Sequence, residues 1–320
     1  MTGMVLSLQV ALPLVLIAWL AFRPAQSRAG FGFQAVGTGA FLVALALVAQ
    51  WALPVWWLPR VYGGLWLAAL PTGLLRGRAT ARPTWPAGLV GWVGAVLSVM
   101  LICVGGWYGA RAVAGRGLPP VEVVDIANPL GPGRYLVGNG GSTRMVNVHL
   151  ATLDPTVARF RAWRGQSYAV DFFGLGPWGL RARGWRPADP AAYAIFGATL
   201  RAPCTGKVVV AEGDMPDFEV PKSDQVNRLG NHVILRCGEA EIVFAHMRQG
   251  SVTVAAGDRV AVDDRLGEVG NSGASSEPHL HIHAQRPAPE GAPPISGAPL
   301  ALRIEGRHLV RGDRLSGVHR

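Results

Sequence analysis

Three of the eight histidines in this 320-residue chain occupy alternate positions within residues 278–283. Successive side chains of a β-strand point to opposite faces, so this spacing places His279, His281 and His283 on one face. The leucine and isoleucine between them then face the core. Neutral imidazole is a common zinc ligand, so the pattern indicates a metal site. The alternative is a solvated polar face, which the scarcity of histidine elsewhere in the chain disfavours.

Three segments resemble, in order, the motifs of the lysostaphin-type zinc endopeptidases. They are residues 166–172, residues 244–246, and residues 267–273 followed by residues 277–281. The first is similar to the family's metal motif ending in a ligand aspartate, and the second to its aromatic-x-His. The third is the most specific, because it reproduces both a glycine-rich turn and a His-x-His pair. The resemblance extends over roughly residues 146–285.

This resemblance implies site residues by position. Asp171 and the second histidine of the pair, His281, correspond to zinc ligands, and His246 and His279 correspond to catalytic histidines. Three protein ligands leave a fourth zinc position for water, as a catalytic site requires. Imidazoles near such a water could stabilise the developing oxyanion and carry a proton to the leaving amine.

The third ligand departs from the family pattern, which has a histidine four residues before the aspartate. Ser167 stands at that position, and serine is a poor zinc ligand. We predict that His149, further upstream, supplies the missing nitrogen, so that the metal ligands are His149, Asp171 and His281. The alternative is a degenerate site that binds no zinc.

The resemblance therefore implies a zinc-dependent metalloendopeptidase that hydrolyses peptide bonds, with peptidoglycan peptides as substrate. The residues themselves do not distinguish peptidoglycan from another peptide. A second hypothesis is a catalytically degenerate domain that binds or regulates a cell-wall hydrolase. A third is a carrier domain of the lipoyl or sugar-phosphotransfer type, which residues 257–260 resemble. It is disfavoured because neither Lys207 nor Lys222 lies in a lipoyl-type turn.

The elements expected around these residues are strands. After residue 118, short β-branched runs alternate with turn residues, which predicts an all-β domain with an antiparallel sheet, sandwich-like or barrel-like. Residues 214–229 are polar, contain two prolines and predict a long loop that could line a substrate groove. The proline-rich residues 286–299 indicate a spacer. The predicted strands are residues 121–126, 206–211, 232–237, 241–246, 251–254, 259–262, 280–284 and 301–304.

The first third of the chain is apolar and contains no acidic residue. It predicts a transmembrane bundle of about four helices, at residues 5–22, 41–58 with a start near residue 35, 61–75 and 87–108. A cleaved signal peptide is the competing interpretation of the first run, and the further apolar runs disfavour it. We predict a transmembrane region at residues 1–116 and a β-rich peptidase domain at residues 117–320, with its core at 146–285.

Charge predicts the orientation. Arginines follow the first span and lie between the third and fourth, so the positive-inside rule places these loops in the cytoplasm. Everything after the fourth span then lies outside, which for this family implies the periplasmic side of a bacterial inner membrane. The net charge of +10 is scattered and almost all arginine, which does not favour nucleic-acid binding. Cys204 and Cys237 form either a disulfide, if the domain is exported, or two buried thiols.

Overall fold

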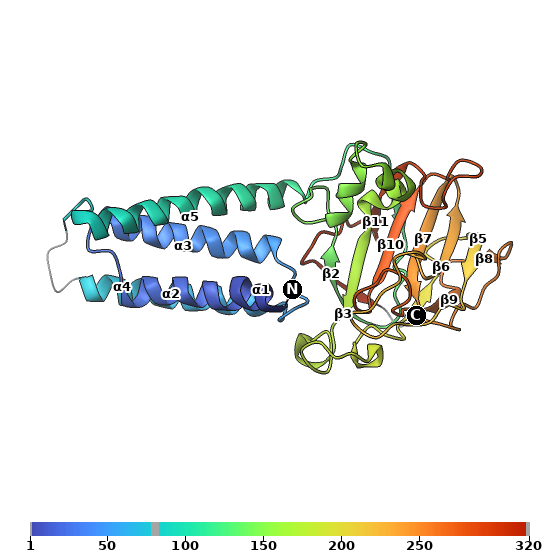
Figure 1. Ribbon diagram of the computed structural model, residues 1–320, viewed down its shortest axis with the longest axis horizontal. Helices are drawn as coiled ribbons and strands as arrows, with labels where there is room; N and C mark the ends of the chain where they lie inside the picture. Colours follow the sequence, from blue (N-terminus) through green and yellow to red (C-terminus); the bar gives the residue numbers. More distant parts are fainter. Residues whose placement is uncertain (1, 78–82, 318–320) are drawn as a thin grey trace. The chain divides into compact units, whose positions relative to one another are not determined.

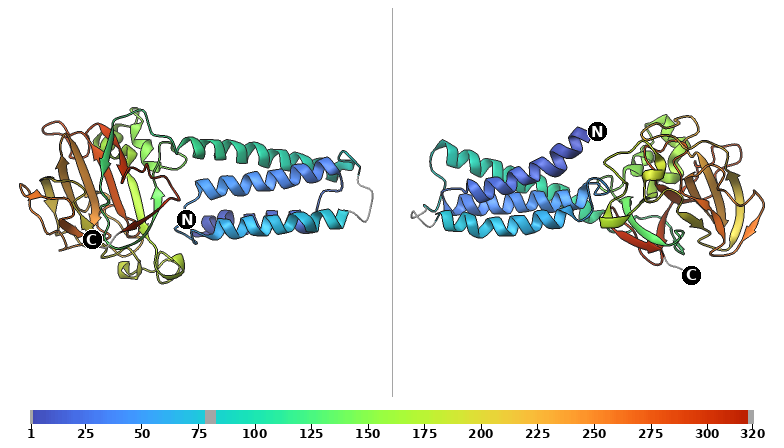
Figure 2. Two further views of the ribbon diagram at one scale, coloured as in Figure 1. Left: turned by 180° about the vertical axis from the view of Figure 1, so that it is seen from behind. Right: turned by 90° about the horizontal axis from the view of Figure 1, so that it is seen from below.

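The computed structural model describes residues 2–77 and 83–317. The chain divides into two compact units, Met1–Val113 and Ala114–Arg320. The first is helical and the second is rich in β-strands (Figures 1 and 2). The predicted fold class, a helical transmembrane region followed by an antiparallel β domain, is confirmed.

Helices fill the described part of the first unit. They are α1 (Thr2–Val5), the π-helical η1 (Leu6–Ala11), α2 (Leu12–Phe22), α3 (Arg28–Val48), α4 (Leu58–Gly77) and α5 (Gly88–Ala114). Three helical stretches are long and apolar enough to cross a membrane: Gly3–Phe22, Arg28–Val48 and Gly88–Ala114. Leu89 and Val90 on α5 are more than four-fifths exposed, as lipid-facing side chains would be.

Two expected spans differ from the structure. The second was placed too far along the chain, because α3 already begins at Arg28, where the Ser27 hydroxyl accepts a hydrogen bond from the Gly30 amide. The helix ends at Val48, and the connection that follows contains Pro54. Proline disfavours helical conformation in the residue that precedes it. The third span corresponds to α4, which contains Pro71 and does not belong to the three apolar stretches.

The second unit is built on a ten-stranded sheet with the order β12-β2-β3-β10-β7-β6-β5-β8, in which all neighbours are antiparallel. Strand β11 pairs with β10 and, in parallel, with β1. Strands β4 and β9 form a separate two-stranded sheet. The strands are β1 (Val123–Ile126), β2 (Gly133–Asn139), β3 (Val170–Gly174), β4 (Thr199–Arg201), β5 (Gly206–Glu212), β6 (Asn231–Cys237), β7 (Ala240–Met247), β8 (Arg259–Val260), β9 (Arg265–Glu268), β10 (Leu280–Gln285), β11 (Pro299–Ile304) and β12 (Arg314–Gly317).

The two faces of the large sheet have different roles. On one face, Phe172, Phe244 and Leu280 are fully buried in a core that also contains Leu200 and Leu266 of the small sheet. This face therefore makes the sandwich. Because successive side chains of a strand point to opposite faces, the neighbours of core residues lie on the other face of the sheet. They include one carboxylate on β3 and two histidines on β10.

Sequence patterns missed part of this domain. Strands β2, β3, β4, β9 and β12 were not anticipated, and residues 251–254, although described, lie outside the strands. Residues 286–298 are not a bare spacer either, since Ile295 within them is buried against the large sheet. Residues 251–254 and 286–298 were misassigned because they are irregular segments packed on the core, and such packing leaves no periodic pattern.

A disulfide joins Cys204 to Cys237 at the end of β6, with their Cα atoms 6.0 Å apart. The two cysteines are separated by 33 residues. Closing a loop of that length restricts the unfolded chain and stabilises the fold by about 3–4 kcal/mol in the chain-entropy model. Cys103, in α5, is free and exposed.

Candidate metal centre

Three side chains from separate segments converge on the outer face of the large sheet. His149 comes from the 3-10 helix η2 (Val148–Leu153), Asp171 from β3 and His281 from β10. One nitrogen or oxygen of each lies within 4.8 Å of the others. Asp171 and His281 are direct neighbours because β3 and β10 pair with these two residues opposite one another.

The spacing suits a tetrahedral metal ion. Donors about 2.0–2.2 Å from zinc at tetrahedral angles lie roughly 3.3–3.5 Å apart. His149 Nε2 is 3.6 Å from Asp171 Oδ2, and His281 Nδ1 is 3.0 Å from Asp171 Oδ1. These distances run to different oxygens of the Asp171 carboxylate, and each is close to the donor spacing that zinc requires. Two imidazole nitrogens and a carboxylate are also a donor set that zinc accepts.

A buried asparagine fixes the donor atom of His149. The Asn147 amide nitrogen donates to the carbonyls of Gly141 and Ala169, so its oxygen is left to face His149 Nδ1 at 3.0 Å. Since an amide oxygen only accepts, Nδ1 carries the hydrogen and Nε2 presents its lone pair to Asp171 and the centre. Burial lowers the pKa of His149 to about 4, with Asp171 opposing the shift, so the ring is neutral.

Asp171 is held as a carboxylate. Asn139 donates its amide N–H to Oδ2 at 2.7 Å, and Arg311 in turn donates to the Asn139 oxygen at 2.7 Å. Burial alone would raise the pKa of Asp171, but His149 and His281 beside it hold that pKa well below 3.8. Neither Asn139 nor Arg311 was anticipated, because strand pairing and a distant loop bring them to the site.

His281 is backed by a further histidine. His281 Nε2 lies 3.1 Å from His283 Nδ1, on the side away from Asp171. For His281 Nδ1 to offer its lone pair to a metal, Nε2 must carry the hydrogen and donate it to His283. His283 is fully buried, and its own Nε2 has no hydrogen-bond partner within the described chain. Burial lowers its pKa well below 6.5, so it is a neutral acceptor.

The two remaining histidines share one arrangement. His246 Nδ1 donates to the Ser272 carbonyl at 2.9 Å, and His279 Nδ1 donates to the Glu277 carbonyl at 2.8 Å. Both rings therefore present Nε2 as an acceptor, and their centroids lie 4.8 Å apart. His279 Nε2 is 3.9 Å from Asp171 Oδ1. Two imidazoles with Nε2 as the acceptor thus lie beside the three candidate ligands.

His246 reaches the centre only because the backbone breaks strand alternation. It follows Phe244 by two residues in β7 and would share that residue's core-facing side. Its φ of +60° turns the chain locally into the left-handed region, which is uncommon for a residue other than glycine. The conformation is held by the bond from the His246 amide to the Leu229 carbonyl. Strained positions of this kind concentrate at functional sites.

Two glycines permit the close approach of loops behind His246. Gly230 and Gly273 both have positive φ, at +60° and +71°. A Cβ on Gly273 would overlap the backbone nitrogen of Gly230, and a Cβ on Gly230 would overlap Ser272. The carbonyl that orients His246 therefore depends on two residues without side chains.

The first-motif serine does not face the centre. Ser167 is fully buried, donates to the Arg164 carbonyl and shares a 2.8 Å hydrogen bond with Thr152. Thr152 lies in η2, the helix that carries His149. Ser167 thus attaches η2 to the 3-10 helix η3 (Ala158–Tyr168) and positions the segment of His149.

Three other histidines, His232, His308 and His319, lie outside the sequence motifs. His232 lies on β6 and is buried, and His308 is partly buried in the turn after β11. His319 lies outside the described residues. His232 also lines a cavity in the β-rich unit.

Residues 191–293 match peptidase family M23. The M23 match includes His246, His279 and His281, and it begins after His149 and Asp171. No curated protein matches the chain.

Similar solved structures include M23 and related peptidases. Lysostaphin from Staphylococcus simulans is 22% identical, with 37% of each chain covered and a TM-score of 0.24. The M23 protein EnpA catalytic domain from Enterococcus faecalis is 25% identical over 31% of this chain and 73% of that one, with a TM-score of 0.19. A zinc-containing peptidase from Vibrio cholerae is 17% identical over 36% and 46%, with a TM-score of 0.22. This chain thus spans little more than a third of the length of lysostaphin.

Replacing His283 tests whether it orients His281. His283→Leu removes the acceptor for His281 Nε2–H and is expected to weaken zinc binding by about 10-fold to 100-fold, the usual effect of losing such a partner. His283→Gln keeps an acceptor oxygen at similar reach and should stay close to the original affinity. Competition between the full-length protein and a chromogenic chelator measures both. Equal affinities for the two variants would contradict the role.

The depressed pKa of His149 predicts acid sensitivity of the metal-free protein. Between about pH 6.5 and 4 the unfolded chain binds a proton that the folded site excludes. The stability is complete above pH 6.5 and falls as pH drops through this window, by about 3 kcal/mol for this one group. The measurement is the free energy of unfolding of the full-length protein as a function of pH, in the presence of chelator. Proteolytic cleavage within the β unit reports the unfolding. His149→Gln should flatten the pH dependence, and parallel slopes would refute the assignment.

Proposed function

We propose that this protein is a membrane-anchored, zinc-dependent endopeptidase that hydrolyses peptide bonds in peptidoglycan. The M23 match and the His-Asp-His cluster support a peptidase. The observation that carries the zinc assignment is the set of fixed donors. His149 Nε2 and an Asp171 oxygen face one point, and His281 Nδ1 joins them if its other nitrogen donates to His283.

Hydrolysis requires residues that bind the zinc ion and residues that transfer a proton. Held by His149, Asp171 and His281, zinc would polarise the scissile carbonyl and activate a water molecule. His246 is kept neutral, because burial lowers its pKa well below 6.5. Its Nε2 lone pair can accept a proton during the reaction, and the Nε2 of His279 is placed to do the same. The pair can therefore take the proton from the attacking water and return it to the leaving amine.

A buried ion pair next to His279 helps to fix the position of that side chain. Arg181, which is 5% exposed, is 2.9 Å from the Glu277 carboxylate and lies over the ring of Tyr193. The Glu277 carbonyl accepts the His279 Nδ1–H. The ion pair thus restrains the turn that aims His279 at the centre.

Peptidoglycan is proposed as the substrate because of motif and location together. The motif resemblance is to endopeptidases of the cell wall. With α4 counted as the third of four spans, the arginine distribution predicts that the C-terminal unit lies outside. The disulfide between Cys204 and Cys237 favours the same side, since such bonds persist in oxidising compartments. A tethered domain there would lie beside the wall polymer.

The rival hypothesis is a regulator without activity, and Ser167 is its support. Ser167 occupies the place of a family ligand, but it is committed to Thr152 and the Arg164 carbonyl. His149 supplies a nitrogen at the same centre. The observed donor set favours the enzyme.

Metal analysis combined with digestion separates the two hypotheses. The full-length protein is expected to bind one zinc per chain and release peptide fragments from purified muropeptides, as seen by mass spectrometry. His281→Ala should lose both zinc and activity. His246→Ala should keep zinc and lose about 10²-fold to 10⁴-fold in rate, because only a proton acceptor is removed. Zinc binding without hydrolysis by the unaltered protein would favour the regulator, and His308→Ala serves as control.

Thiol trapping in intact cells tests the orientation. Blocking free thiols before lysis, then reducing and labelling with a bulky maleimide, should modify Cys204 and Cys237 but not Cys103, the free thiol. The expected product therefore carries two labels. A protein without labels would place the β unit in a reducing compartment and contradict the proposed orientation.

A further inference from the structure

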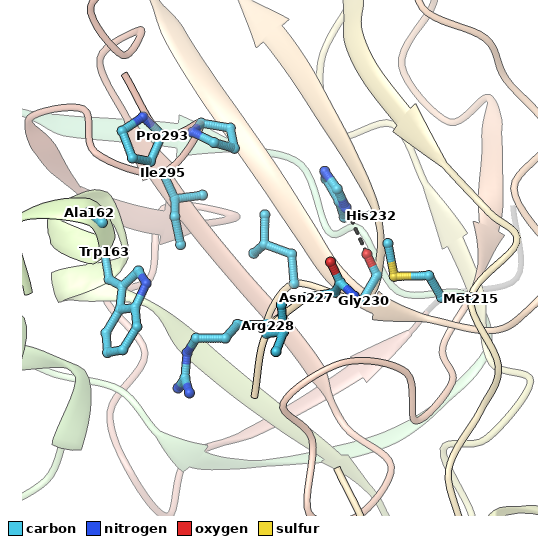
Figure 3. Close-up of a pocket in the computed structure, with 12 residues that line it drawn as sticks. Ala162, Trp163, Met215, Asn227, Arg228, Gly230, His232, Pro293 and Ile295 are labelled. Carbon is cyan, nitrogen blue, oxygen red and sulfur yellow. Dashed lines mark hydrogen bonds between the residues drawn. The ribbon is translucent and has the colours of Figure 1, made fainter. Parts of the chain in front are cut away.

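A cavity of about 320 Å³ opens on the same unit as the candidate metal centre, formed by three segments that are distant in sequence. Figure 3 shows Trp163 and Ile295 on one side and His232 and Met215 on the other. Its walls are mostly apolar. The lining residues are Ala162, Trp163, Met215, Val226, Asn227, Arg228, Leu229, Gly230, His232, Pro293, Pro294 and Ile295.

The cavity lies on the face of the sheet that carries the metal centre. On β6, Val233 belongs to the sandwich core, whereas Ile234 packs with Ile295 on the other side. Alternation then gives His232 the same face as Ile234. His281 pairs with Ala245 of β7, and β6 is the next strand after β7. With strands about 4.8 Å apart, His232 lies roughly 10 Å from His281.

One wall of the cavity also contacts a proposed catalytic residue. The Leu229 carbonyl accepts the bond from the His246 amide, and Gly230 lies against Ser272, which orients the His246 ring. An extended peptide advances about 3.3–3.6 Å per residue. A peptide bond at the centre would therefore place a side chain two or three residues away at the mouth of this cavity.

The polar group inside is a hydrogen-bond acceptor. His232 Nδ1 donates to the Gly230 carbonyl at 2.7 Å, so Nε2 of the neutral ring holds a lone pair (Figure 3). His232 is 8% exposed, and Nε2 has no partner within the described chain. Burial lowers its pKa, which keeps the ring neutral. An acceptor at the cavity wall that has no protein partner can bind a ligand that brings a donor.

The charges around the cavity select against ions. Arg228 lines the wall, with its guanidinium carbon 4.3 Å from the centre of the Trp163 ring. It donates a hydrogen bond to the Gln225 side chain. Its positive charge would repel a cation. None of the described lining residues is acidic. Arg228 would attract a carboxylate, but that carboxylate would also face the lone pair of His232 and apolar walls, which disfavour it.

We propose that this cavity is a specificity pocket for one uncharged side chain of the peptide cleaved at the metal centre. The hydrocarbon part of that side chain would lie between Trp163 and Ile295, and its terminal N–H or O–H, as in a primary amide, would donate to His232 Nε2. The pocket rests on the proposed function. Trp163 and Ile295 lie outside residues 191–293, so two of its walls come from beyond the M23 match.

A peptide panel tests the pocket. The full-length protein in detergent is given peptides that differ at one residue, scanned over three positions on each side of the cleaved bond, with glutamine, leucine, glutamate or lysine there. At one position kcat/KM is expected to be highest for glutamine, about fivefold to tenfold above leucine, the effect of one hydrogen bond. Glutamate and lysine should be poorer than leucine.

Variants on opposite walls then assign the preference. His232→Phe keeps a ring but removes the acceptor, and should abolish the advantage of glutamine over leucine. Ile295→Ala enlarges the pocket and should shift preference toward bulkier uncharged side chains. Unchanged zinc content shows that each variant folds, and His308→Phe is the control.

The outcomes separate this inference from the function on which it rests. Cleavage with the same selectivity in both wall variants as in the unaltered protein would overturn the pocket alone. A preference for glutamate or lysine would overturn it as well. If the unaltered protein cleaves no peptide or muropeptide, the proposed function and the pocket both fall.

Discussion

The site depends on fixing which nitrogen of each buried imidazole carries the hydrogen. A neutral ring has one donor and one acceptor, and only the acceptor can bind a metal or take a proton. Here an oxygen behind each of His149, His246 and His279 accepts from Nδ1 and leaves Nε2 facing inward. His281 is turned the other way, with His283 behind its Nε2. Removing one of these hydrogen-bond partners would leave the imidazole in place. The ring could then carry its hydrogen on either nitrogen, and the inward nitrogen would no longer be fixed as the acceptor.

Strand pairing sets the distances, and local irregularities set the directions. Antiparallel β3 and β10 place Asp171 opposite His281, which makes a short contact unavoidable. His246 cannot reach this face from a regular strand, and the positive φ at that residue supplies the turn. Regular sheet therefore accounts for two of the groups, and a strained residue held by the Leu229 carbonyl accounts for a third.

The sequence revealed the parts of the site that are local. Alternate histidines in one strand predict a shared face without any tertiary knowledge, and His281 and His283 lie on one. Asn147 and Arg311 could not be found in this way, because their roles come from chain segments that meet only after folding. The same limit explains residues 286–298, whose Ile295 packs on the sheet although its neighbours resemble a linker. Helix α3 was misplaced because its start depends on the Ser27 cap and not on apolar periodicity.

The 3-10 helix η3 contributes both to the candidate metal centre and to the cavity. Its residue Ser167 stands where the lysostaphin-type motif has a histidine. Ser167 and Trp163 both lie in η3, one bonded to the helix that carries His149 and the other lining the cavity. A histidine at position 167 would replace the hydroxyl that holds Thr152, and η2 would lose that attachment. The donor from His149 therefore requires η3 to pack as it does. That packing also sets where Trp163 stands, so the ligand set and the cavity wall cannot vary independently.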